Sequence, residues 1–432
     1  MTSFAQIKRA VLVFAVIGTA WAANAADLPR AKPSAVGLNQ AAMDKLDADM
    51  KALVDDGKRA GVVYGVMRKG KLVALKAYGM RDVARGLPME TDSQFRLYSQ
   101  SRAVTAAAIL TLADEGKLGL DDPVAKYLPE IGKMQVIKTM ARGVVTETEP
   151  QRTPMTVREL FNYTSGLGYA ADWPKSLGMS QRDILALDSN LAETITKLSK
   201  YPLMYQPGAK WVYGFHSDVL GRIAEVVSGQ PFDEFLRARL TAKIGMTDTD
   251  FWTKPGEENR LAEVYTPAKD GSGLMRRDAI PSSTYTKPSH MFSAGGGLIS
   301  TVEDYLRFCQ MLLNGGALDG VEILKPATIA AMGTNALTPA QGGEVNWYRY
   351  EQDAFFRGYG WGLAIGVRLP DTVHTMPGSD GDLTWGGLAN TTYFLDPAED
   401  ITAVAMSQYL GPNADELEFT LREGVYAALG KK

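Results

Sequence analysis

Ser99 and Arg102 stand three residues apart in the stretch FRLYSQSRAV, which opens a run of helix-forming residues. Residues three apart on a helix share one face, so the Arg102 side chain can approach the Ser99 hydroxyl. A helix N-terminus also presents free N–H groups, which stabilise an oxyanion beside the serine. The pair is compatible with a serine nucleophile beside a fixed positive charge. The two residues alone favour a simpler alternative, in which Ser99 is an ordinary helix N-cap.

An arginine at this position restricts the chemistry. No serine in the chain has a lysine three residues later, and Ser93-x-x-Arg96 is the only other Ser-x-x-Arg. A buried lysine can lose its proton and act as a base, whereas an arginine cannot. Arg102 can therefore supply only charge, and another group must accept the proton of Ser99.

The sequence gives little support for a metal centre, a disulfide or a cofactor-binding motif. The three histidines, His216, His290 and His374, are far apart, and Cys309 is the only cysteine. These residues predict neither a metal centre nor a disulfide. The chain has no Gly-x-Ser-x-Gly motif, and the glycine-rich segment 293–297 lacks the surroundings of a phosphate-binding loop. We therefore expect no cofactor.

The composition is that of a globular protein, with 432 residues, 45% of them hydrophobic and 22% charged. The 46 basic and 49 acidic residues give a net charge of -3, and no long basic run is present. Nucleic acid is therefore not an expected partner.

The first 25 residues have the pattern of an export signal. Lys8 and Arg9 precede an apolar run from Ala10 to Trp21, and small residues in an A-x-A pattern follow. The apolar run is too short to span a bilayer. The mature chain is therefore expected to begin near Ala26, without stable membrane insertion, in the periplasm or outside the cell.

Strand patterns occur near both ends of the chain, and helical patterns lie between them. The segment 61–78 is typical of a hairpin around Lys69-Gly70, and TTYFLDPAEDITAVAMSQ predicts a second hairpin. We expect a sheet built from both ends with a helical lobe inserted. The expected divisions are a signal peptide (1–25), the first part of an α/β lobe (26–125), a helical lobe (126–284) and the second part of the α/β lobe (285–432).

Five segments together resemble one family of enzymes, in its expected order: FRLYSQSRAVTAAAILTLADEG, TVRELFNYTSGL, PGAKWVYGFHSDVLG, SAGGGLISTVEDYLRF and LTWGGLANTTYFLDP. They look like the serine hydrolases related to class C β-lactamases and family VIII carboxylesterases. The resemblance covers nearly all of the mature chain. It implies an α/β plus all-α fold of the β-lactamase type, with an antiparallel sheet flanked by helices.

The resemblance also implies roles for individual residues. Ser99 would be the nucleophile and Tyr213 the catalytic tyrosine, while Trp385-Gly386-Gly387 would be the strand motif that meets the substrate. The backbone N–H groups of Ser99 and Leu388 would form the oxyanion hole. Two positions depart from the family pattern, because Arg102 replaces a lysine and Phe215 replaces a polar residue.

These departures decide the expected mechanism and substrate. With no lysine available, Tyr213 is the remaining candidate base, and the charge of Arg102 can help its phenol to ionise only in a site that excludes water. Trp385 stands where β-lactamase relatives have a cation, so an uncharged small ester or amide fits better than a β-lactam. The alternatives are a non-hydrolytic protein that binds a ligand or peptide, and an acyltransferase.

Overall fold

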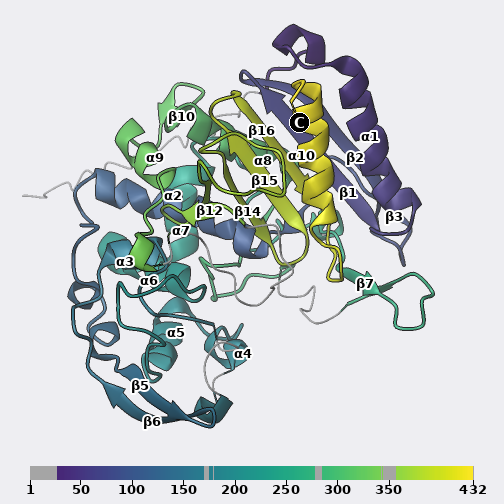
Figure 1. Cartoon of the computed structure of the whole chain (residues 1–432). Coiled ribbons are helices and arrows are strands. Elements are labelled where there is room, and N and C mark those ends of the chain that lie inside the picture. Colours follow the sequence, from purple (N-terminus) through teal and green to yellow (C-terminus); the bar gives the residue numbers. More distant parts are fainter. Residues whose placement is uncertain are drawn as a thin grey trace, which may run out of the picture.

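An eight-stranded antiparallel sheet forms the centre of this computed structural model (Figure 1). The structure describes residues 27–169, 175–178, 180–277, 285–341, 343 and 357–431, so the expected signal segment 1–25 lies outside it. In spatial order the strands are β12 (Tyr359–Trp361), β13 (Gly366–Arg368), β14 (Leu383–Gly387), β15 (Thr391–Asp396), β16 (Ile401–Met406), β1 (Gly61–Arg68), β2 (Lys71–Asp82) and β3 (Leu87–Pro88).

Both predicted hairpins are present. Lys69 and Gly70, with φ of 51° and 67°, form the turn between β1 and β2. Asp400, with φ of 49°, lies in the turn between β15 and β16. The two hairpins pair with each other, with Val63 of β1 opposite Met406 of β16. The two ends of the chain therefore build one sheet, as expected.

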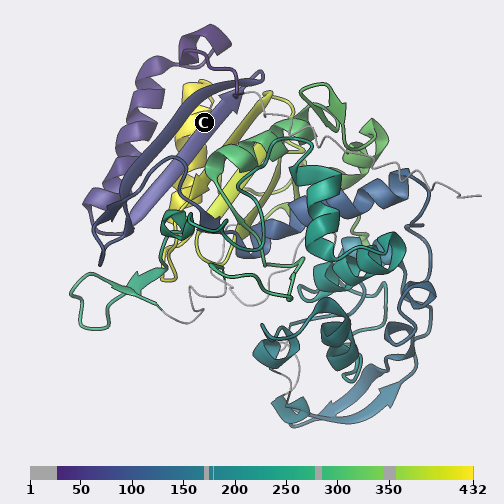
Figure 2. The same cartoon turned by 180° about the vertical axis from the view of Figure 1, so that it is seen from behind.

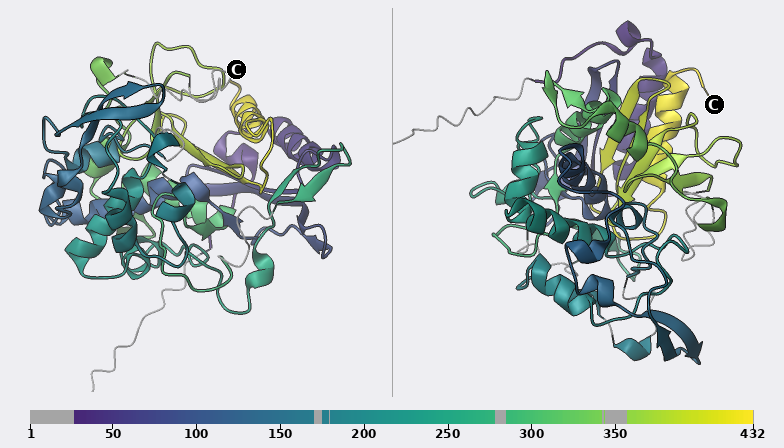
Figure 3. Two further views of the ribbon diagram at one scale, coloured as in Figure 1. Left: turned by 90° about the horizontal axis from the view of Figure 1, so that it is seen from below. Right: turned by 90° about the vertical axis from the view of Figure 1, so that its left-hand side faces the viewer.

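Helices cover both faces of the sheet, as Figures 2 and 3 show. Helices α1 (Gln40–Asp55) and α10 (Glu416–Ala428) pack together on one face. On the other face lies α8 (Val302–Leu313), where a Cβ added to Gly65 of β1 would be 2.7 Å from Leu306. Glycine at this point lets the helix approach the sheet closely.

Helix α2 (Ser101–Asp114) lies between α8 and the helical lobe, and every residue from Ser101 to Leu112 is buried. A helix that is buried on all sides lies in the interior of a protein. It contacts α6 and α7 of the lobe. The helices of the lobe are α3 (Val157–Phe161), α4 (Gln181–Ile184), α5 (Leu191–Leu198), α6 (His216–Ser228) and α7 (Phe232–Leu236), the last continued by a π-helical turn at Arg237–Thr241.

The segment 126–284, expected to be helical, also contains two hairpins. These are β5 (Val136–Ala141) with β6 (Val144–Glu149), and β7 (Tyr265–Pro267) with β8 (Leu274–Arg276). Both strands of the first hairpin are largely exposed, so they lack the apolar alternation that marks a half-buried strand. The smaller elements outside the lobe are β4 (Phe95–Arg96), β9 (Ile299–Ser300), β10 (Ala317–Leu318), β11 (Val321–Glu322) and α9 (Pro326–Met332).

Among the described residues, no helix combines the length and the apolar composition needed to cross a bilayer. The same part of the chain holds no cluster of histidine, cysteine or carboxylate side chains arranged to bind a metal ion. Cys309 is buried in α8.

Candidate active site

Ser99 lies in a short 3-10 turn, Tyr98–Gln100, that leads directly into α2. Tyr98 and Gln100 are buried, whereas Ser99 is partly exposed. Tyr98 has a φ of 45°, a left-handed conformation that is uncommon for a residue other than glycine. Neither this turn nor α2 has a side-chain cap, so the N-cap alternative for Ser99 is not what the structure contains. The serine instead lies directly before the start of a helix.

The guanidinium of Arg102 is fully buried one turn further along α2. Its Nη1 donates hydrogen bonds to the Tyr163 hydroxyl (2.8 Å), the Gly214 carbonyl (3.2 Å) and Ser217 Oγ (3.2 Å), and its Nη2 donates to the Tyr169 hydroxyl. None of these hydrogen bonds goes to Ser99, which was the expected neighbour. The longer side chain of arginine instead reaches the residues around the start of α6.

Tyr213 lies between Arg102, which was expected to act on it, and Trp385, which was expected to meet the substrate. The guanidinium carbon of Arg102 is 4.2 Å from the centroid of the Tyr213 ring, over its face. The indole N–H of Trp385 donates a hydrogen bond to the Tyr213 hydroxyl oxygen at 3.0 Å. The structure therefore brings Arg102, Tyr213 and Trp385 together, from α2, the loop before α6 and β14 respectively.

The end of β14 lies against the backbone just before Ser99. A Cβ added to Gly387 would be 2.1 Å from the carbonyl oxygen of Leu97, so only glycine allows this approach. Leu97 precedes Ser99 by two residues, and Leu388 directly follows Gly387. Both expected oxyanion-hole donors, the N–H groups of Ser99 and Leu388, therefore belong to segments that meet here. The Leu388 side chain is 64% exposed.

Tyr163 is a site residue that sequence reasoning did not identify. Helix α3 ends at Phe161, and Tyr163 follows in a left-handed conformation with φ of 60°. Its ring stacks on His216, with the centroids 4.5 Å apart. Burial raises the pKa of Tyr163 to about 12, although the charge of Arg102 lowers it. The sequence signal for Tyr163 is the motif FNYTSGL, which belongs to one of the five segments that resemble the family.

Asp218 on α6 was also missed. It is buried and accepts hydrogen bonds from Ser293 Oγ (2.6 Å) and the Gly295 N–H (3.3 Å). Burial raises the pKa of Asp218, while Ser293 and Arg102 lower it. A Cβ on Gly295 would be 2.9 Å from Asp218 Oδ2 and 3.4 Å from Arg102 Nη2. The glycine-rich segment thus packs its backbone against both charges.

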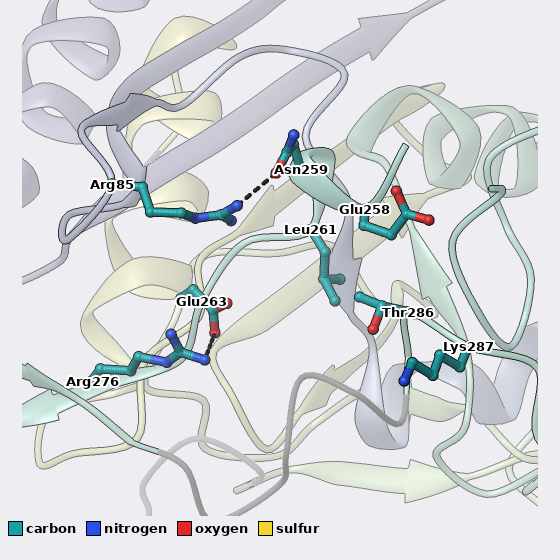
Figure 4. A pocket seen from close by; sticks show the side chains of 8 residues that line it. All are labelled: Arg85, Glu258, Asn259, Leu261, Glu263, Arg276, Thr286 and Lys287. Carbon is teal, nitrogen blue, oxygen red and sulfur yellow. Dashed lines mark hydrogen bonds and ion pairs between the residues drawn. The ribbon is translucent and has the colours of Figure 1, made fainter. Parts of the chain in front are cut away.

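A cleft of about 330 Å³ opens beside the β7–β8 hairpin (Figure 4). Charged side chains surround it, and in Figure 4 two of them, Arg85 and Arg276, bond to Asn259 and Glu263. Its lining residues are Arg85, Glu258, Asn259, Leu261, Glu263, Arg276, Thr286 and Lys287. None of the predicted site residues lines this cleft.

Comparisons with known proteins identify the family and the fold of the chain. The family model "Beta-lactamase" matches residues 46–425. An uncharacterized protein of Mycobacterium tuberculosis is 33% identical over 373 residues, covering 85% of this chain and 90% of that protein. Esterase EstB of Burkholderia gladioli is 30% identical over 421 residues, covering 91% of this chain and 98% of that protein.

Solved structures share the same fold. EstCE1, described as a hydrolase with promiscuous acyltransferase activity, superposes with a TM-score of 0.72 at 25% sequence identity. The match covers 89% of this chain and 99% of EstCE1. The sheet built from both ends, the inserted lobe and the match to the family model lead to the same conclusion: the chain belongs to the beta-lactamase family and has its fold.

Proposed function

We propose that this protein is an exported serine hydrolase that cleaves small uncharged esters through an acyl-enzyme on Ser99. The observation that carries the proposal is the placement of the buried Arg102 guanidinium over the ring of Tyr213. Arginine keeps its proton, so it acts as a fixed charge and Tyr213 acts as the base.

The proposed reaction has two stages. Ser99 Oγ attacks the ester carbonyl carbon while its proton passes to the Tyr213 phenolate, and the N–H groups of Ser99 and Leu388 bind the oxyanion. The C–O bond of the ester then breaks, and the departing alcohol takes the proton from Tyr213. Water next attacks the acyl group, giving one proton to Tyr213. That proton returns to Ser99 Oγ as the acid leaves.

The proposed base requires a nearby positive charge in a site that excludes water. A phenol with a reference pKa near 10 needs about 4 kcal/mol to be half ionised at neutral pH. One cation at about 4 Å supplies about 4 kcal/mol at an effective dielectric constant of 20, but only about 1 kcal/mol in water. The Arg102 guanidinium carbon lies 4.2 Å from the centroid of the Tyr213 ring, and Arg102 is fully buried, so the charge is close to the ring and shielded from water. The Trp385 N–H adds a hydrogen bond that stabilises the ionised phenol.

The residues near the nucleophile favour an uncharged substrate. Trp385 presents an indole where a cation would be needed to bind a carboxylate, and the exposed Leu388 side chain adds an apolar surface beside the oxyanion hole. The similarity to esterase EstB supports ester cleavage. Export rests on the pattern of the first 25 residues.

Acyl transfer is a second candidate, favoured by the similarity to EstCE1. An acyl-enzyme reacts with whichever acceptor reaches it, so an alcohol can replace water in the second stage. Adding a primary alcohol to the assay separates the two outcomes, because transfer yields a new ester whereas hydrolysis yields only the acid.

Hydrolysis of short-chain p-nitrophenyl esters tests the proposal. Activity should disappear in Ser99→Ala and Tyr213→Phe. Tyr359→Phe removes a buried hydroxyl that bonds Asp382 at 3.1 Å, within the sheet, and should keep wild-type activity. Equal rates for the wild type and Ser99→Ala across a broad ester panel would contradict the proposal and favour a non-hydrolytic binding protein.

A further inference from the structure

The Tyr163 hydroxyl closes a triangle of hydrogen bonds at the buried guanidinium. Nη1 of Arg102 donates to Tyr163 (2.8 Å) and to Ser217 (3.2 Å), and the two hydroxyl oxygens are 2.9 Å apart. Because arginine can only donate, both oxygens accept from it and one hydroxyl donates to the other. Nη1 is therefore held by these two hydroxyls as well as by the Gly214 carbonyl.

The backbone around Tyr163 is specialised for this contact. Tyr163 has the left-handed φ of 60°, which is costly for an aromatic residue and persists only where the surroundings enforce it. Its side chain is completely buried and stacks on His216 at the start of α6. Ser217 is the next residue of that helix, so one helix end holds both the ring and the hydroxyl.

We propose that Tyr163 is a positioning residue that holds the Arg102 guanidinium over the ring of Tyr213, and that Ser217 holds the Tyr163 hydroxyl in place. The guanidinium carbon is 4.2 Å from the Tyr213 centroid and 5.4 Å from that of Tyr163. Tyr163 thus accepts a hydrogen bond from the guanidinium through its hydroxyl, whereas the ring of Tyr213 lies closer to the guanidinium carbon than the ring of Tyr163 does. The inference rests on the proposed function, in which Tyr213 is the base.

Other titratable groups face the same guanidinium. Tyr169 accepts a hydrogen bond from Nη2, and burial raises its pKa. Asp218 on α6 has a pKa raised by burial and lowered by Ser293 and Arg102. Burial and the charge of Arg102 lower the pKa of His216 far below its ordinary value, so this imidazole stays neutral. Trp385 on β14 does not titrate.

Tyr163→Phe removes the hydroxyl and keeps the ring, so it isolates the positioning role. The readout is the rate at which an aryl phosphonate labels Ser99, measured across pH, because this reaction needs the base but no turnover. Without the Tyr163 hydroxyl the guanidinium keeps only Gly214, Ser217 and Tyr169 as acceptors, so it is held less firmly over the Tyr213 ring and supports the proposed base less well. The acidic limb of the profile should shift to higher pH by about one unit, so that labelling is about tenfold slower on that limb. At high pH the labelling rate should return to that of the wild type.

Two further variants sharpen the test. Ser217→Ala removes only the Ser217 hydroxyl and should shift the limb in the same direction by a smaller amount. In an Arg102→Lys background, Tyr163→Phe should leave the profile unchanged, because no guanidinium remains to be held. The control Tyr359→Phe should match the wild type.

The three ways in which this test can fail are distinct. A uniform loss of rate at every pH, or a loss of the same size in the wild-type and Arg102→Lys backgrounds, would overturn the positioning role and leave the proposed function standing. Absence of label on Ser99 in the wild type would overturn both. If thermal melting reveals that Tyr163→Phe is unfolded, the pH profile of Ser217→Ala decides the question.

Discussion

The indole N–H of Trp385 bonds the hydroxyl oxygen of Tyr213 at 3.0 Å, joining the edge of the sheet to the loop before α6. A donor at this oxygen stabilises the phenolate more than the phenol. In the proposed mechanism the tryptophan therefore has a chemical role beyond packing, because its N–H stabilises the negative charge on Tyr213.

Trp385→Phe keeps the aromatic packing and removes the donor. Because a hydrogen bond to a charged group contributes about 1.5–3 kcal/mol, kcat/KM for ester hydrolysis should fall by roughly 10- to 100-fold. The comparison requires steady-state kinetics of the variant and wild type at one pH, with melting temperatures to exclude unfolding. Unchanged kinetics would show that the indole only packs against the ring.

Arg102→Lys should give activity equal to or higher than that of the wild type. A buried amine can release its proton and act as an ordinary base, whereas the guanidinium cannot. The matched variant Arg102→Met keeps a long side chain without charge and should lose activity by roughly 100-fold or more. A pH–rate profile of all three proteins identifies the base. Complete loss in Arg102→Lys would mean that the geometry of the guanidinium is indispensable.

Gly387→Ala should disrupt the oxyanion hole. The new Cβ would meet the Leu97 carbonyl oxygen at 2.1 Å, a contact with backbone that no side-chain rotation relieves. Separating the two segments should lower kcat by about 100-fold, as expected for a lost oxyanion donor. The neighbouring Gly386→Ala, whose Cβ would be 3.1 Å from the Thr391 carbonyl oxygen, should have a much smaller effect. Similar losses in both variants would argue against this role.

Asp304 should make stability depend on pH. Burial raises the pKa of this carboxyl from 3.8 to about 7, with opposing contributions from Thr249 and Arg307. Since the folded pKa lies above the unfolded one, the folded state binds the proton more tightly. The contribution to stability is complete below about pH 4 and is lost as pH rises to about 7, a change on the order of 4 kcal/mol.

Urea unfolding of Asp304→Asn at pH 5 and pH 8 checks this sign. The free energy of unfolding of the variant should not fall between pH 5 and pH 8. At pH 8 the variant should therefore be more stable than the wild type. Asp121→Asn, at a carboxyl whose side chain is 78% exposed, should change neither value by more than a few tenths of a kcal/mol. A wild type that is equally stable at both pH values would contradict the assignment.

Local patterns were sufficient to predict the main elements. Lys69-Gly70 specified a hairpin because both residues accept a positive φ, and the run after Ser99 had the composition of a helix. The meeting of Tyr213 with Trp385 depended on the family resemblance, since the two residues are 172 positions apart. No local pattern could have placed them together.

The partners of Arg102 were beyond sequence reasoning. Spacing on a helix predicts which face a residue occupies, but a long side chain chooses among all the acceptors within its reach. Tyr163 and Ser217 became acceptors only because the chain after α3 folds back onto the start of α6. The β5–β6 hairpin was missed for a different reason, since its exposed strands carry no apolar alternation.

The pairing of β1 with β16 affects when the proposed active site can form during folding. Ser99 follows the first hairpin, whereas Trp385 lies in β14 and Leu388 in the turn after it, and the sheet closes only when both halves of the chain are present. Contacts this distant in sequence form late and slowly. The proposed active site would therefore be assembled only after the C-terminal strands had joined the rest of the sheet.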